Sequence, residues 1–200
     1  MSRAGRCSGG GSVTGISLYN YNITSEIPSE ICNLRNLTTL DLSDFSPSRI
    51  PEELGNLKKL NFSWWASTNL IGEIPKSFEN LSSMEQLDLA MNHLEGEIPR
   101  GLFLLPKLKN LYLYNNQLSG SIPSDFAENS TLVEVVLSGN KLTDEIPGGF
   151  GELQRLEVLA LFWNQLSGGA LPLEMGLHST LEGHGRALEN DSCIAMNGMI

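Results

Sequence analysis

The sequence is poor in the residues that build metal centres and disulfide frameworks. Its 200 residues include three cysteines, Cys7, Cys32 and Cys193, which are far apart and show no Cys-x-x-Cys spacing. Neither a zinc site nor a self-contained disulfide framework is therefore predicted. Basic residues are also scarce, because 13 Lys and Arg stand against 23 Asp and Glu, giving a net charge of −10. This balance disfavours nucleic-acid binding, which needs clustered Lys and Arg.

Long apolar stretches are absent too. The sequence has no run of about 18 apolar residues, so it predicts no transmembrane helix. Residues 1–13 carry two arginines but no apolar segment of the kind found in a secretory signal, so no signal peptide is predicted. We expect either that the product stays inside the cell or that its natural start lies further upstream.

Catalytic constellations are missing from the pattern of residues. The three histidines are His93, His178 and His184, and none has a carboxylate or thiol at metal-ligand or triad spacing. The Gly-His-Gly segment at 183–185 is too short for a phosphate-binding loop, and residues 182–200 contain no kinase motif. The sequence therefore predicts no enzyme activity, no metal and no cofactor.

What the chain does contain is a repeat. The dipeptide Ile-Pro recurs six times and is followed by one Leu-Pro, with the prolines 23 to 25 residues apart, from Pro28 to Pro172. A fixed period of this length is typical of one supersecondary unit copied and stacked into a solenoid. We expect seven units, which begin at Val13, Leu37, Leu60, Met84, Leu108, Leu132 and Leu156.

Each unit has the same internal pattern. Apolar and polar residues alternate around Leu111 and Leu113, which predicts a short strand in a parallel sheet. An asparagine that can bridge the backbones of adjacent turns follows the strand, then a glycine, then the proline that begins a helical or 3-10 turn. The asparagines are Asn92, Asn116, Asn140 and Asn164, and the glycines are Gly72, Gly96, Gly120 and Gly168.

The pattern breaks at several places. Thr68 replaces the asparagine, so the bridging ladder should be incomplete there, and Ser63 replaces an inward leucine whose space Trp65 is expected to fill in part. The repeat stops after Leu181. We therefore divide the chain into an irregular N-terminal segment (1–12), a solenoid (13–182) and a disordered non-repeat tail (183–200).

The consensus L-x-x-L-x-L-x-x-N-x-L-x-G-x-I-P, present at 84–99 and 108–123, resembles the plant-type leucine-rich repeat. The stretches SVTGISL, TNLIGEIP and LEVLALFWNQLSG resemble ectodomains of plant leucine-rich repeat receptor-like kinases, more narrowly the HAESA-like group. The resemblance implies an α/β solenoid with a parallel concave sheet and a 3-10 or short-helical convex side. The N-terminal cap of the family has a paired cysteine motif, of which only Cys7 remains. We interpret the chain as a fragment truncated before any transmembrane or kinase segment.

Six Asn-x-Ser/Thr sequons are present, more than the composition predicts by chance, and they favour a glycosylated extracellular or plasma-membrane protein. The alternative is that Asn, Ser and Thr are simply favoured in repeat turns. The predicted glycosylation sites are Asn22, Asn36, Asn61, Asn80 and Asn129, with a sixth sequon at Asn190 in the tail.

The outward residues of the predicted strands form the candidate binding face. Exposed aromatic rings among charges are typical of a protein or peptide contact surface. The predicted ligand-binding residues are Trp64, Asp88, Lys109, Tyr112, Tyr114, Phe162 and Trp163. The alternative is that these rings merely pack on one another, which we favour for Phe62 and Trp64 beside Ser63. The Arg-x-Arg pair that reads a peptide carboxylate in related receptors has no counterpart here.

The sequence thus predicts a non-catalytic module that binds a peptide or protein ligand, with a co-receptor implied by the resemblance. One alternative is a secreted inhibitor of microbial cell-wall enzymes, similar to the polygalacturonase-inhibiting proteins. Another is a non-functional truncated receptor product. An ice-binding solenoid would need a flat, regular row of Thr, Asn or Ser, which the charged and aromatic face does not provide.

Overall fold

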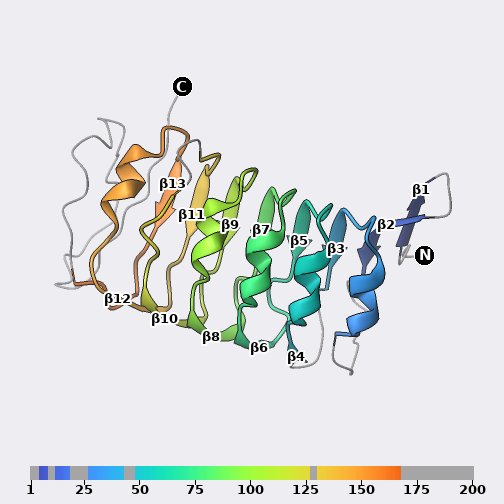
Figure 1. The fold of residues 1–200 in the computed structure, drawn as a ribbon. Helices are drawn as coiled ribbons and strands as arrows, with labels where there is room; N and C mark the ends of the chain where they lie inside the picture. The colour runs from blue at the N-terminus through green and yellow to red at the C-terminus, as the bar shows by residue number, and fades with distance from the viewer. Residues whose placement is uncertain (1–4, 9–11, 19–26, 43–47, 127–129, 168–200) are drawn as a thin grey trace.

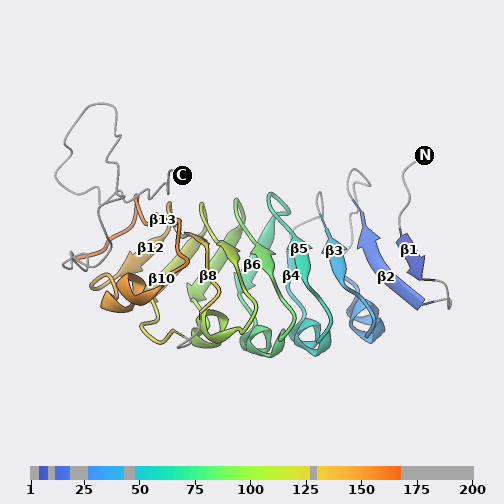
Figure 2. The same ribbon diagram turned by 90° about the horizontal axis from the view of Figure 1, so that it is seen from above.

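The structure is a computed structural model that describes residues 5–8, 12–18, 27–42, 48–126 and 130–167. The chain winds as a row of stacked coils, with short strands on one side and 3-10 turns on the opposite side (Figures 1 and 2). The predicted solenoid is therefore confirmed. The C-terminal tail, residues 183–200, lies outside the described residues, as do Cys193, Gly168 and Pro172.

The larger sheet, here called the concave sheet, has eight strands, of which all but the first run parallel. In spatial order they are β1 (Gly5–Ser8), β2 (Ser12–Ser17), β3 (Thr39–Asp41), β5 (Phe62–Trp64), β7 (Gln86–Asp88), β9 (Asn110–Tyr112), β11 (Glu134–Val136) and β13 (Val158–Ala160). This arrangement confirms the parallel sheet that the repeat predicts.

Within the segment 1–12, for which an irregular conformation was predicted, residues 5–8 form a strand. β1 pairs antiparallel with β2, with Gly5 opposite Ile16 and Ser8 opposite Ser12. The segment Gly-Arg-Cys-Ser has little strand propensity, and its pairing satisfies the backbone groups at the open edge of β2. A sheet edge, rather than the local sequence, thus accounts for this strand.

A second parallel sheet, which was not predicted, lies along the other border of five successive coils of the described chain. Its strands are β4 (Ser48–Arg49), β6 (Leu70–Glu73), β8 (His93–Glu97), β10 (Gln117–Ser121) and β12 (Lys141–Thr143). They pair in the order β12-β10-β8-β6-β4. In its central strands φ is +78° at Gly72 and Gly96 and +76° at Gly120, which is the left-handed conformation expected of these glycines.

The convex side carries the expected 3-10 turns, and each begins directly after a proline of the repeat. Pro has a fixed φ and no N–H, so it suits the start of such a turn. The turns are η1 (Ser29–Asn33), η2 (Glu52–Asn56), η3 (Lys76–Asn80), η4 (Arg100–Leu104) and η5 (Gly148–Glu152).

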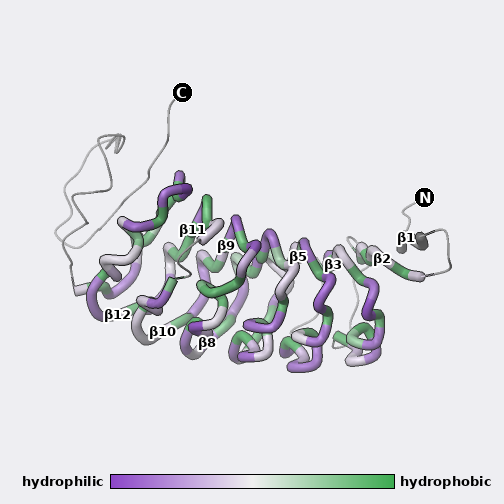
Figure 3. The backbone as a smooth tube through the Cα atoms, turned by 45° about the horizontal axis from the view of Figure 1, so that its top comes forward, coloured by the Kyte–Doolittle hydropathy of each residue, from purple (hydrophilic) through white to green (hydrophobic). Residues whose placement is uncertain are grey.

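The core lies between the sheets and the turns. The middle residue of each concave strand points inward, so that Leu40, Ser63, Leu87, Leu111 and Val135 are aligned as successive Cα partners and are all fully buried. Hydrophobic and hydrophilic stretches accordingly alternate along every coil (Figure 3). Burial of each leucine contributes about 1.5–3 kcal/mol, offset by chain entropy, so that the stacked coils hold one another together.

The predicted asparagine ladder is present. Asn116 donates from Nδ2 to the carbonyls of Leu89 (2.9 Å) and Leu113 (3.1 Å), and its Oδ1 accepts the N–H of Leu94 at 3.0 Å. Asn140 and Asn164 repeat these bonds one and two coils further on.

Thr68 changes the ladder as expected. Its hydroxyl donates within its own coil to the Trp65 carbonyl at 2.7 Å, and Oδ1 of Asn92 on the following coil is a second, longer acceptor for the same proton at 3.1 Å. Asn92 spans from its own coil to the carbonyl of Trp65 at 2.7 Å. Thr68 therefore bonds within its own coil and to the following coil, and the side chain of Asn92 joins these two coils.

Ser63 and Trp65 occupy neighbouring inward positions of one coil. Both are fully buried, and the Ser63 hydroxyl has no hydrogen-bond partner within the described residues. Trp65 packs edge-on against Phe78 and donates from Nε1 to the carbonyl of Leu40 at 3.0 Å. The indole thus takes an inward position that leucine holds in the next coils. That it also fills part of the space beside Ser63 stays a prediction.

Candidate ligand-binding face

The outward residues of the concave sheet form two rows. One row runs through the first residue of each strand and the other through the third, because side chains alternate across a strand. Hydrogen bonding fixes neighbouring strands about 4.8 Å apart, so each outward side chain has a partner from the next coil beside it. The face is therefore a grid in which residues 23 or 24 positions apart in the sequence lie side by side on neighbouring strands.

An acid–aromatic stripe occupies the centre of the second row. Its members, Asp41, Trp64, Asp88 and Tyr112, are successive Cα partners on β3, β5, β7 and β9. Three of the seven predicted ligand residues, Trp64, Asp88 and Tyr112, thus lie side by side. Beyond the stripe, the second row continues on β11 and β13 with Val136 and Ala160.

Trp64 is held by its neighbour in the same strand. Its ring stacks on that of Phe62, with centroids 5.7 Å apart and planes 6° apart, and 39% of Trp64 remains exposed. The two rings therefore pack on one another, as the alternative interpretation has it, yet the indole still faces solvent. Stacking fixes the orientation of the indole and lowers the entropy that a contact with a ligand would cost.

Tyr112 is fixed by polar contacts. Its hydroxyl donates to the Glu134 carboxylate on β11 and accepts the side-chain amide of Asn110 at 2.9 Å. Burial, and then the hydrogen bond to Glu134, raise the pKa of Tyr112 to about 12. The phenol is therefore neutral at physiological pH, and its ring offers an immobile surface.

Asp88 lies between the two aromatic residues of the stripe and is partly buried. Burial raises the pKa of its carboxyl group, while the hydrogen bond that Oδ1 accepts from the Ala90 N–H at 3.1 Å acts in the opposite direction. No cation pairs with Asp88 within the described residues. Its negative charge is therefore incompletely compensated by the protein.

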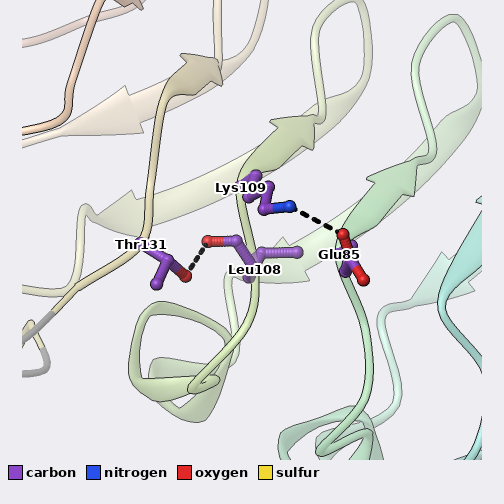
Figure 4. A network of polar contacts seen from close by, with 4 residues as sticks. All are labelled: Glu85, Leu108, Lys109 and Thr131. Atoms are coloured by element: carbon purple, nitrogen blue, oxygen red, sulfur yellow. Dashed lines mark hydrogen bonds and ion pairs between the residues drawn. The ribbon is translucent and has the colours of Figure 1, made fainter.

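Lys109 stands at the start of β9 and faces the preceding coil. Its Nζ lies 2.8 Å from Oε2 of Glu85 (Figure 4). On the other side of the same coil, Thr131 donates from Oγ1 to the carbonyl of Leu108 at 2.8 Å. The predicted ligand residue Lys109 thus has an ion-pair partner on the face itself.

The remaining predicted residues follow their strands. Tyr114 lies two residues after β9 and is partly buried. Phe162 and Trp163 lie after β13, where their rings meet edge-on with centroids 4.9 Å apart, and Trp163 is 65% exposed. Since β11 separates β9 from β13, the structure does not bring Phe162 and Trp163 next to the stripe.

Two residues of this face, Asp41 and Glu134, were not among the predicted ligand residues. Asp41 begins the stripe and accepts a hydrogen bond from Ser17 at 2.9 Å, and Glu134 anchors Tyr112. Both occupy outward strand positions of the repeat, and this position was the signal in the sequence that could have identified them. The sequence pattern names the positions, but it does not say which of them bond to one another.

The sequons fall on different surfaces. Asn36 and Asn80 are exposed and Asn61 is partly buried, whereas Asn22 and Asn129 lie outside the described residues. The Asn36 amide donates to Ser12 at 2.8 Å and its oxygen accepts from Lys59 at 2.7 Å. Asn80 ends the turn η3 on the convex side. Glycosylation at these positions stays a prediction.

A hollow of about 980 Å³ lies away from the concave face, next to η3, η4, β8 and β10. Its lining includes Glu79, Glu97 and the ion pair between Arg100 and Asp125, which measures 2.7 Å. Both side chains of this pair are strongly exposed, so it contributes little to stability.

Within the described ranges, no three His, Cys, Asp or Glu side chains are grouped so that they could hold a metal ion. No helix in that part of the chain is both long and apolar enough to cross a membrane. The described surface therefore presents the concave sheet and the hollow as its candidate sites, and the sheet carries the aromatic residues.

Comparisons with known proteins agree with this architecture. Residues 106–166 match the family model described as leucine rich repeat. Receptor-like protein EIX1 of Solanum lycopersicum is 45% identical over 90 residues, which are 44% of this chain and 8% of that protein. The chain spans less than a tenth of the curated relatives it matches.

Solved structures are similar over more of the chain. The ectodomain of the Arabidopsis receptor kinase HAESA, in complex with the peptide hormone IDA and the co-receptor SERK1, has a TM-score of 0.70 and 38% identity over 78% of this chain and 26% of that one. A plant ice-binding protein has a TM-score of 0.69 and 31% identity over 82% of this chain and 54% of that one. The chain is thus a leucine-rich repeat solenoid that resembles plant receptor ectodomains, as predicted.

Proposed function

We propose that this chain, a leucine-rich repeat solenoid of the plant receptor type, is a non-catalytic segment of a cell-surface receptor that binds a peptide across its concave sheet. Its relatives are receptor-like proteins and receptor ectodomains, and the HAESA structure holds a peptide hormone and a co-receptor. Because the ice-binding protein shares the fold, the fold alone does not carry this proposal.

The observation that carries it is the acid–aromatic stripe. Trp64 and Tyr112 present fixed rings on a rigid sheet, and rigid aromatic anchors dominate the affinity of many peptide and protein contacts. Seven parallel strands spaced about 4.8 Å apart span roughly 30 Å, which suits an extended peptide of about nine or ten residues. A peptide of this length can reach from the stripe to Trp163.

A binding assay tests the proposal. The purified chain is titrated with a panel of plant signalling peptides, and the peptide that binds is titrated again against Tyr112→Ala and Tyr114→Ala. We expect Tyr112→Ala to weaken binding at least about tenfold, since the loss of an aromatic anchor costs that much or more. Tyr112→Phe keeps the ring and should retain most of the affinity.

The control is Glu95→Gln on β8, an exposed residue of the second sheet, which should bind like the unmodified chain. Circular dichroism of every variant confirms that the solenoid is intact. Binding that is unchanged by both tyrosine substitutions, or no binding by any peptide, counts against the proposal.

We also propose that the segment resides outside the cell, by resemblance to its receptor-like relatives. Exposed Asn36 and Asn80 support this, because N-glycosylation occurs in the secretory pathway. Expression behind a heterologous signal peptide should give a product whose electrophoretic mobility increases after endoglycosidase treatment. Asn36→Gln and Asn80→Gln should each remove part of that shift, and a product without any shift contradicts this part of the proposal.

A further inference from the structure

Carboxylates dominate the described part of the concave face. The outward rows and the residues at the strand starts include five acidic side chains and one basic one. These are Asp41, Glu85, Asp88, Glu134 and Glu157, with Lys109. Because Lys109 is paired with Glu85 at 2.8 Å, it does not offset the charge of the stripe. The field over this part of the sheet is therefore negative and favours a cation.

The stripe combines this charge with aromatic surface in a regular order. Asp41, Trp64, Asp88 and Tyr112 alternate carboxylate and ring on four successive strands. With strands about 4.8 Å apart, the two aspartates stand roughly 10 Å from each other on either side of the indole. A side chain that enters over Trp64 has a carboxylate on both flanks and a second ring beyond Asp88.

The existing hydrogen bonds of Tyr112 and Asp88 determine what each residue can offer to a ligand. The Tyr112 hydroxyl is already bonded to Glu134 and Asn110, so its ring is what it offers. Asp88 accepts one backbone N–H and is without a cationic partner in the described part of the chain. Carboxylates beside an exposed indole suit a guanidinium or ammonium group, which forms charge-assisted hydrogen bonds with the acids and a cation–π contact with the ring.

We propose that the acid–aromatic stripe is a subsite for a positively charged side chain, arginine or lysine, of an extended peptide lying across the concave sheet. The inference rests on the proposed function and adds the chemistry of the ligand to it. The cation lies over Trp64 and is bonded to Asp88. An acidic peptide is rejected by the same carboxylates.

An unbiased selection tests this inference. A phage library of random ten-residue peptides is panned against the purified chain, and the selected peptides are resynthesised. We expect them to share an Arg or Lys at one position, and replacement of that residue by Gln should weaken binding about tenfold or more. Binding should also weaken with rising salt.

Matched variants locate the subsite. Asp88→Asn keeps the acceptor for Ala90 and removes the charge, and it should lower the affinity for the basic peptides about tenfold. Trp64→Phe keeps an aromatic ring, whereas Trp64→Leu keeps only apolar bulk, so Trp64→Leu should lose more affinity than Trp64→Phe. Glu95→Gln on the second sheet is the charge-matched control and should bind like the unmodified chain.

The outcomes separate this inference from the function on which it rests. Selected peptides that lack a shared basic residue, or that bind Asp88→Asn and Trp64→Leu with full affinity, overturn the cation subsite and leave peptide binding in place. Failure to select any peptide counts against both. A shared basic residue that loses its effect in Asp88→Asn supports the subsite.

Discussion

The hydroxyl of Tyr112 on β9 donates a hydrogen bond to the carboxylate of Glu134 on β11, and Asn110 donates to that same hydroxyl from within β9. This contact joins two coils across the open face of the sheet, 22 residues apart in sequence. It holds one ring of the candidate site in place from the side opposite to Asp88. Its protonation behaviour is therefore a direct probe of the local geometry.

Tyr112 should titrate late. Its pKa of about 12 lies above the ordinary value of 10.0, mainly because burial disfavours the phenolate and further because the neutral hydroxyl donates a hydrogen bond to Glu134. The stability linked to this group is fully present below pH 10 and is lost as pH rises from about 10 to about 12, since the unfolded chain ionises first. Ultraviolet titration of phenolate should show one tyrosine that ionises last and that disappears in Tyr112→Phe.

Glu134→Gln should lower the pKa of Tyr112 part of the way towards 10, because the contribution of burial stays while that of the carboxylate is removed. A pKa that is unchanged or higher in Glu134→Gln contradicts this account.

Asp88 should make the chain slightly less stable than its amide counterpart at neutral pH, and this difference should vanish in acid. Its raised pKa means that the folded state favours the protonated carboxyl group, so the stability linked to Asp88 is present below the ordinary pKa of 3.8 and is lost as pH rises through the raised value. Asp88→Asn should therefore be slightly more stable than the unmodified chain at pH 7, by about 0.5 kcal/mol or less for so accessible a site. Urea unfolding at several pH values should show this advantage shrinking towards pH 4, and an advantage independent of pH refutes the expectation.

The asparagine ladder should be a major source of stability. Asn116→Ala removes one hydrogen bond each from the carbonyls of Leu89 and Leu113, which keep those from Asn92 and Asn140, and it takes the side-chain acceptor from the buried Leu94 N–H. The N–H left without this acceptor costs about 1–3 kcal/mol and each lost carbonyl bond about 0.5–1.5 kcal/mol, so a loss of at least about 2 kcal/mol is expected in urea unfolding. The exposed neighbour Gln117→Ala should change stability by less than about 0.5 kcal/mol. Equal losses in the two variants are inconsistent with a ladder.

Two buried hydroxyls should respond in opposite directions. Ser63→Ala removes a buried hydroxyl without a partner and should raise the free energy of unfolding by up to about 1 kcal/mol. Thr68→Val removes a hydroxyl bonded to Trp65 and Asn92 and should lower it by about 1–2 kcal/mol. The same sign for both substitutions shows that hydrogen bonding does not distinguish the two sites.

Replacing a glycine by alanine should lower stability in the second sheet and raise it at the start of a turn. At Gly120 φ is +76°, and an added Cβ meets Cγ of Glu97 at 2.9 Å, so Gly120→Ala should cost about 1–2 kcal/mol. Gly148 begins η5 with no atom within 4 Å of an added Cβ, so Gly148→Ala should add about 0.4–1 kcal/mol. Thermal unfolding of the two variants measures both effects, and a loss at Gly148 speaks against the assigned geometry.

Much of the fold could be predicted because the same pattern of residues recurs in seven units of the sequence. The inward leucines, the asparagine ladder and the proline before each 3-10 turn follow from residue type and period alone. The second sheet could not be predicted in this way. Its strands are two to five residues long, and β6, β8 and β10 each contain a glycine, so their local pattern resembles a turn. They form strands because each pairs with the same segment of the neighbouring coil.

The sequence alone determined the architecture and the outward positions of the concave face, since a two-residue alternation inside a 24-residue period leaves each side chain only one side of the sheet. The tertiary structure decided which of those side chains meet. Trp64 stacks on Phe62, and Tyr112 donates a hydrogen bond to Glu134 on the next strand. Phe162 and Trp163 contact each other after β13 and are separated from Tyr112 by β11. Backbone hydrogen bonds fix the spacing of the coils, but the rotamer of each side chain depends on neighbours that only stacking supplies.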